Sequence, residues 1–132
     1  MIYYKVSSMK KSESLFTVPE LARELKLTER AIRFYEAKGL ISPKRLGKTR
    51  VFNYKDKARL IIIIRSKKLG FTLNEIKEYL DLYDVDPNHK KQSELALIKI
   101  RNRIRKLKDQ SKEIKIILTE LKQLERQIEK DH

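Results

Sequence analysis

The side chains with the clearest capacity for chemistry lie between residues 28 and 54, where cations and aromatic rings occur close together. Arg30, Arg33 and Tyr35 fall within one short segment, and guanidinium and phenol groups donate hydrogen bonds to base edges and phosphate oxygens. Phe34 has no hydroxyl and is expected in the core. The segment therefore indicates a nucleic-acid contact, and its plainer alternatives are a solvated arginine surface and simple packing of Tyr35.

A second group of cations follows on a segment with a glycine at its centre. This group consists of Lys44, Arg45, Lys48 and Arg50. Cations on such a loop contact flanking phosphates or the minor groove, and the alternative is a loop that is only solvated. Arg65 and Lys68 form a third basic group, for which phosphate contact and a solvated basic face both remain open.

The chain offers no residue set for catalysis or for a bound cofactor. It has no cysteine, which excludes thiolate metal sites and disulfides. His89 and His132 have no carboxylate or hydroxyl partner at a catalytic spacing. The stretch 47–49 ends like a phosphate-binding loop, but Ser42 stands where that loop needs its first glycine. We expect no enzyme activity, no cofactor and no metal.

Two short helices are predicted to position the first group. Thr17 and Glu20 have the spacing of a capping box, and the apolar residues after them share one face of a helix that ends near Leu25. A three-residue connection leads to a second helix, with Thr28 as its N-cap and Gly39 as its stop. Such a pair is a helix-turn-helix, whose second helix enters the major groove. Thr28, at the start of that helix, is therefore also a candidate DNA contact.

The remaining elements of the module follow from turn and cap residues. Residues 40–53 carry a proline and a glycine between short apolar ends, which predicts a β-hairpin with the second basic group near its tip. A third helix is predicted over 54–69, and its apolar run 60–64 should be buried. A fourth begins at Thr72 and ends near Tyr83.

One long helix is predicted from residue 90 to about residue 129, because neither proline nor glycine interrupts it. Apolar residues recur in it at the a and d positions of about five heptads. These are Leu97, Ile100, Ile104, Leu107, Ile114, Leu118, Leu121 and Ile128. A small module cannot bury such a stripe, so the helix is predicted to pair with a second copy of itself. Ser111 and Glu125 interrupt the stripe and are expected to set register or orientation.

Composition limits the function classes further. The chain has 132 residues, a formal net charge of +14 and a sequence pI near 10.0, and its positive excess is greater in residues 15–80 than in 93–132. Such charge indicates a polyanion, either nucleic acid or an anionic membrane surface. No apolar run has transmembrane length and the first residues lack a signal-peptide pattern. We therefore expect no membrane partner and a cytoplasmic, nucleoid-associated protein.

Two motifs give the chain a family resemblance. The block A-I-R-F-Y-E-A-K-G-L-I-S-P, residues 31–43, closely resembles a signature of the MerR family of bacterial transcription regulators, and K-L-G-F-T-L-N-E-I, residues 68–76, resembles a second one. The resemblance covers roughly residues 15–83 by motif. The long helix matches the family's dimerisation helix in position. Parts of the sequence look most like the cysteine-poor regulators of branched-chain amino-acid and fatty-acid catabolism.

The resemblance implies a mainly α fold: a winged helix-turn-helix module with a small β-hairpin wing, followed by a long C-terminal helix that forms an antiparallel coiled coil. The expected organisation is a loose N-terminal arm (1–14), the DNA-binding domain (15–83), a linker (84–89) and the dimerisation helix (90–130). Arg33 occupies the position of a family arginine that contacts a base or phosphate, and Tyr35 that of an aromatic that contacts phosphate. The wing departs from the family pattern, being one residue shorter with its glycine earlier.

The function implied is a homodimeric, sequence-specific regulator on an inverted-repeat operator in double-stranded DNA, which distorts a promoter spacer and has RNA polymerase as a further partner. Two alternatives remain at this stage. One is an architectural or excisionase-like DNA binder, which the long pairing helix disfavours. The other is a coiled-coil protein whose basic module binds RNA or acidic partners.

Overall fold

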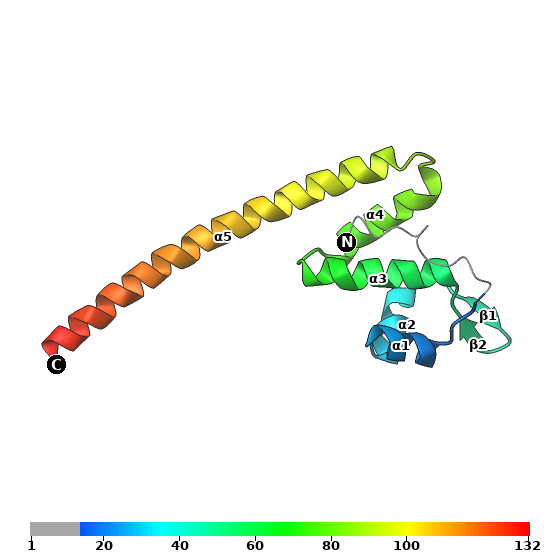
Figure 1. Cartoon of the computed structure of the whole chain (residues 1–132), viewed down its shortest axis with the longest axis horizontal. Coiled ribbons are helices and arrows are strands. Elements are labelled where there is room, and N and C mark those ends of the chain that lie inside the picture. The colour runs from blue at the N-terminus through cyan, green and yellow to red at the C-terminus, as the bar shows by residue number, and fades with distance from the viewer. Residues whose placement is uncertain (1–13) are drawn as a thin grey trace. The chain divides into compact units, whose positions relative to one another are not determined.

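The structure is a computed structural model, and it describes residues 14–132 (Figure 1). The predicted arm, residues 1–14, lies almost entirely outside the described residues. The elements in chain order are α1 (Val18–Leu25), α2 (Glu29–Ala37), β1 (Lys44–Leu46), β2 (Thr49–Val51), α3 (Tyr54–Lys68), α4 (Leu73–Val85) and α5 (Lys90–Asp131). The mainly α fold with a two-stranded hairpin and a long final helix is confirmed.

Short side chains cap the first two helices as the sequence predicts. Thr17 is the N-cap of α1 and forms a reciprocal capping box with Glu20. Lys26 ends α1 in a left-handed conformation, with φ 56°. The Thr28 hydroxyl then accepts a 3.0 Å hydrogen bond from the Ala31 N–H at the start of α2. These two caps bound a connection short enough to hold the helices as a tight pair.

The hairpin pairs β1 with β2 in antiparallel register, with Lys44 opposite Val51. Gly47 turns the chain at φ 64°, a conformation that glycine adopts without strain. Beyond the hairpin, Phe16 and Phe52 exchange two backbone hydrogen bonds of 2.8 Å each. This bridge fastens the chain before α1 to the end of the wing, and no sequence pattern predicted it.

Helix α3 is the central element of the module, with the α1–α2 pair and α4 on opposite sides of it (Figure 1). Leu60, Ile62 and Ile63 are buried, whereas Ile61 and Ile64 are half-buried, so the predicted apolar run is covered on most of its surface. Asn53 and Asp56 form the capping box at its start. Burial raises the pKa of the Asp56 carboxyl, against hydrogen bonds from the backbone of Asn53 and Ser42 that favour its ionised form.

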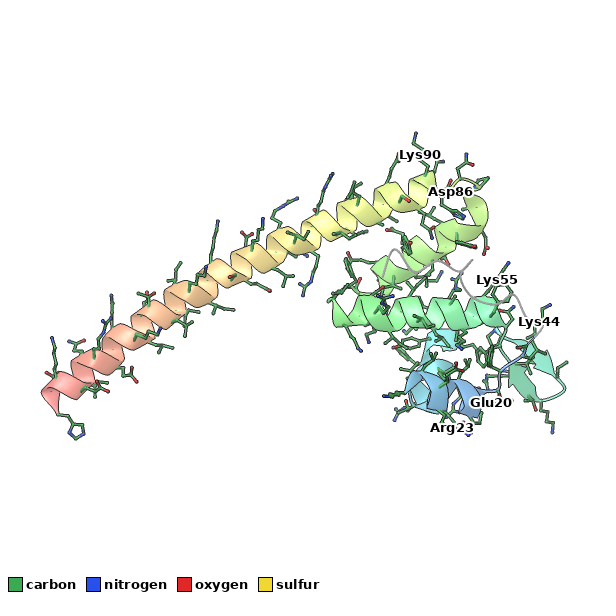
Figure 2. All side chains as sticks on the ribbon, viewed as in Figure 1. Glu20, Arg23, Lys44, Lys55, Asp86 and Lys90 are labelled. Atoms are coloured by element: carbon green, nitrogen blue, oxygen red, sulfur yellow. The ribbon has the colours of Figure 1, made fainter. Side chains whose placement is uncertain are left out.

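Helix α4 begins with the predicted capping box of Thr72 and Glu75 but runs to Val85, two residues beyond the predicted end. No helix-breaking residue occurs before Pro87, and the Asp86 N–H still donates to Leu82. The connection to α5 is therefore residues 86–89, shorter than the predicted 84–89. Asp86 and Lys90 mark this turn in Figure 2.

The first turns of α5 pack with the module. The buried carboxylate of Asp86 accepts a 3.1 Å hydrogen bond from the Gln92 backbone N–H, and the Gln92 amide donates 2.8 Å to the carbonyl of Tyr79. Ala96 is also buried. His89, expected to be an ordinary surface residue, has φ 55° and stacks on Tyr83 with ring centroids 4.7 Å apart. The compact unit that contains the module accordingly extends to residue 96.

From Leu97 onward α5 is an uninterrupted helix that forms its own unit. Its side chains project into solvent on every side (Figure 2), and its leucines and isoleucines from Ile104 to Ile128 are 45 to 62% exposed. Over the part of the chain that the structure describes, no helix is both long and apolar enough to cross a membrane.

Candidate nucleic-acid interface

Helix α2 has one buried face and one exposed face. Ile32 and Tyr35 are buried against the module. The exposed stripe recurs at spacings of three and four residues and consists of Arg30, Arg33, Phe34, Ala37 and Lys38. This is the face that a helix of a helix-turn-helix presents to a groove. The structure therefore brings both predicted arginines of α2 to one accessible surface.

Phe34 corrects the expectation that it would lie in the core. Its side chain is 45% exposed, and the ammonium of Lys38 lies 5.5 Å from its ring centroid. The helical period explains this, because Ile32 and Tyr35 already occupy the inward face and Phe34 follows Arg30 by one turn. The exposed face of α2 thus combines cations with one apolar ring.

Tyr35 packs inward and is only 7% exposed. Burial raises the pKa of its phenol above the ordinary value, so the hydroxyl keeps its proton at neutral pH and remains a hydrogen-bond donor. Arg33 is about half exposed and lies 4.0 Å from Glu29, one turn earlier on the same helix. Exposed pairs of this kind contribute little stability, so the guanidinium remains available to another acceptor.

The wing is connected to α2 through Glu36, which was not predicted as a site residue. Glu36 accepts a 2.5 Å hydrogen bond from Arg50 Nε and lies 3.8 Å from an Arg45 guanidinium nitrogen. Its exposure is low, 23% for the side chain. One carboxylate of α2 therefore orients two arginines of the hairpin.

The other two predicted wing cations, Lys44 and Lys48, are exposed. Neither has a carboxylate within ion-pair distance among the described residues, and Figure 2 shows Lys44 on the hairpin. Arg45 and Arg50 are thus held in place by Glu36, whereas Lys44 and Lys48 are free to contact an anion.

The third basic group lies at the end of α3. Arg65 and Lys68 are exposed in its last turn, together with Lys67. Cations at the C-terminal end of a helix interact favourably with the helix dipole. The position of these residues is therefore no evidence by itself for a phosphate contact. Arg59, which the sequence reading passed over, donates 2.8 Å to the carbonyl of Leu40 and approaches Asp81 to 3.4 Å. It joins the entry of the wing to α3 and α4.

Within residues 14–132, no group of three or more metal-ligating side chains is arranged to hold an ion. What the described chain offers is a helix-turn-helix, a basic wing fixed to it and an exposed cationic helix face. The geometry defines a winged helix-turn-helix, a class of module that binds nucleic acid.

Comparison with known proteins specifies the class. Residues 16–82 match the family model of the MerR HTH family regulatory proteins, and residues 57–124 match a second model, described as MerR, DNA binding. The mercuric resistance operon regulatory protein of Bacillus cereus is 36% identical over 111 residues, which are 82% of this chain and 83% of that protein. The HTH-type transcriptional regulator CueR of Salmonella typhi is 31% identical over 74 residues, 54% of each chain.

The chain belongs to the MerR family. It is a DNA-binding transcription regulator and not an enzyme, with double-stranded DNA as its partner. The resemblance seen in the sequence is confirmed, whereas the catabolism subgroup stays a prediction.

Solved structures agree with this fold. A MerR family regulator from Bacillus cereus aligns with a TM-score of 0.64 at 24% identity, covering 80% of this chain and 76% of that one. HiNmlR, a MerR family regulator lacking the sensor domain and bound to promoter DNA, aligns with a TM-score of 0.59 at 23% identity, covering 80% of this chain and 79% of its own.

The anchoring role of Glu36 is testable by amide hydrogen exchange. Glu36→Gln removes the charge that orients Arg45 and Arg50, and we expect about 1 kcal/mol less local stability in the hairpin, a roughly fivefold faster exchange of β1 and β2 amides. Glu29→Gln is the matched control, because it removes one carboxylate from α2 but only breaks the pair with Arg33. Equal acceleration in both variants would show that Glu36 does not hold the wing.

Proposed function

We propose that the protein acts as a homodimer whose two winged modules read the half-sites of an inverted-repeat operator. The observation that carries this proposal is the apolar stripe of α5. Seven of its eight predicted residues are 45 to 62% exposed, and Ile100 is half-buried. A soluble chain seldom leaves such a contiguous apolar surface uncovered, and a symmetric pair of helices would bury it.

The heptad positions support an antiparallel pair. Leu97, Ile104 and Leu118 occupy a positions, and an antiparallel coiled coil packs each a residue against a d residue of the other helix. In the register with the most such layers, Leu107 packs against Leu118 of the partner subunit, and the two Ser111 side chains lie close to the two-fold axis. A polar pair at the centre fixes register at some expense of stability.

On DNA, the exposed face of α2 would lie in the major groove. Arg30 and Arg33 then reach base edges, and Thr28, at the start of α2, lies nearest the strand that borders the groove. Tyr35 offers its protonated hydroxyl to a phosphate. The remaining proposed contacts are with phosphates and come from Lys44, Arg45, Lys48, Arg50, Arg65 and Lys68.

Regulation would operate through the shape of the promoter. Two modules joined through one paired helix would bind the two half-sites at a limited spacing, and the DNA between them would bend or untwist to fit. Between two promoter elements, such distortion changes what RNA polymerase can engage, and both activation and repression follow from the same geometry. The cytoplasm, at the nucleoid, is where such a regulator would act.

Base reading and phosphate contact predict different responses. Arg33→Ala should weaken the free energy of binding to a selected operator by about 1 to 3 kcal/mol. The loss on a random duplex should be much smaller, because only the operator presents the matching base. Lys44→Ala is the control, since it should weaken binding to both duplexes alike and reduce the slope of log K against log [salt] by about 0.9 per protomer, roughly 1.8 for the homodimer. Both quantities come from fluorescence titrations over a range of KCl concentrations. If Arg33→Ala lowered the affinity for both duplexes equally, Arg33 would contact a phosphate and not a base.

The pairing role of α5 is tested by sedimentation equilibrium. Leu107→Asp places a carboxylate in the apolar stripe and should leave a monomer at micromolar protein, because an unpaired buried charge costs several kcal/mol. Ile116→Asp is the matched control: this isoleucine is 61% exposed and lies outside the stripe, so its variant should remain a dimer. A dimeric Leu107→Asp protein would remove α5 as the pairing element.

A further inference from the structure

Seven cations of α5 lie along one face of the helix. Continuing the heptads, they fill the adjacent b and e positions, which form a single stripe at spacings of three and four residues. This basic stripe consists of Arg101, Arg105, Lys108, Lys112, Lys115, Lys122 and Arg126, all of them exposed. Only Thr119 interrupts it, and the glutamates at the preceding and following e positions, Glu94 and Glu129, mark its ends.

The acidic residues of the same stretch lie elsewhere. Asp109, Glu113 and Glu120 occupy the c and f positions and Glu125 an a position, so none of them belongs to the basic stripe. Asp109 borders the stripe, one turn from Arg105 and Lys112. None of the stripe cations forms an ion pair among the described residues. Like charges one turn apart destabilise a helix by about 0.2 to 0.5 kcal/mol per pair. Repulsion within the basic stripe therefore lowers the stability of α5.

Antiparallel pairing would join two such stripes, and this step rests on the proposed homodimer. In an antiparallel coiled coil, the e positions of one helix lie beside the e positions of the other, so both basic stripes come to the same side. In a parallel pair they would lie on opposite sides. The joined surface repels itself, because lysines such as Lys108 and Lys115 face lysines of the partner, and an anion bound there would relieve the repulsion.

We infer that the basic stripe is a second DNA-binding surface, which holds the phosphate backbone of duplex DNA independently of the winged modules. Charge complementarity supports this, since the stripe carries seven cations and no acidic side chain, and DNA is the polyanion that this regulator binds. Its length also fits. From Arg101 to Arg126 the helix rises roughly 38 Å at 1.5 Å per residue, close to one turn of duplex.

The test compares two double variants of the full chain. Lys108→Gln/Lys112→Gln removes stripe lysines, and Lys106→Gln/Lys130→Gln removes the same number from other faces of α5. Binding to a random-sequence duplex is titrated over a range of KCl concentrations. The stripe variant should lower the slope of log K against log [salt] by about 0.9 per lysine that contacts phosphate, roughly two to four units for the dimer. The control should lower it by less than one unit.

Three outcomes would overturn the inference. One is an equal change of slope in both variants, and another is no change in either. A third is unchanged DNA binding by the stripe variant together with lost binding to phosphatidylserine vesicles, which would assign the stripe to a membrane surface. Sedimentation without DNA separates this inference from the homodimer: the stripe variant should dimerise more tightly than the unmodified chain, whereas an unmodified chain that is monomeric would contradict the pairing itself.

Discussion

The apolar stripe of α5 is the constraint on which the rest of the account depends. Beyond Ala96 the helix packs against nothing within its unit, and its leucines and isoleucines face solvent. Each such side chain gains about 1.5 to 3 kcal/mol when it is fully buried. We propose that a second copy covers this surface, because it offers a partner helix of matching length and pattern. In the proposed homodimer, two-fold symmetry would place the DNA modules in pairs, and the operator would be an inverted repeat.

Within each module, a few ionic and capping contacts convert short elements into a fixed surface. Glu36 ties the wing to α2, Arg59 ties the entry of the wing to α3 and α4, and the Phe16–Phe52 bridge closes the hairpin onto the chain before α1. The wing strands are only three residues long and could not hold a position alone. Arg45 and Arg50 of the wing are oriented because Glu36 of α2 holds them.

The parts of this fold that the sequence predicted are those set by local chemistry. Thr17, Asn53 and Thr72 are N-caps because their side chains bond a backbone N–H within three residues, and Gly47 marks a turn for a similarly local reason. The a and d pattern of α5 was predictable because periodicity is a property of the local sequence. The hairpin and its cations were predictable from the proline, the glycine and the short apolar ends of residues 40–53.

The sequence could not supply contacts made across the fold. Glu36 joins Arg50 from another element, and nothing in its neighbours singles it out from other glutamates. Phe34 was misplaced because hydrophobicity was weighted above helical period, whereas Ile32 and Tyr35 had already filled the inward face. The predicted end of α4 near Tyr83 was two residues early, because the break was assigned to the whole segment 84–88, although Pro87 is its first residue that stops a helix.

Transcription in vitro from promoters that differ only in spacer length tests the central claim most directly. If the paired modules act by distorting the spacer, the effect of the protein should change with its length. Shortening the spacer by one or two base pairs should then make the promoter active without the protein. Equal repression at every spacer length would contradict distortion and leave steric blocking as the mechanism.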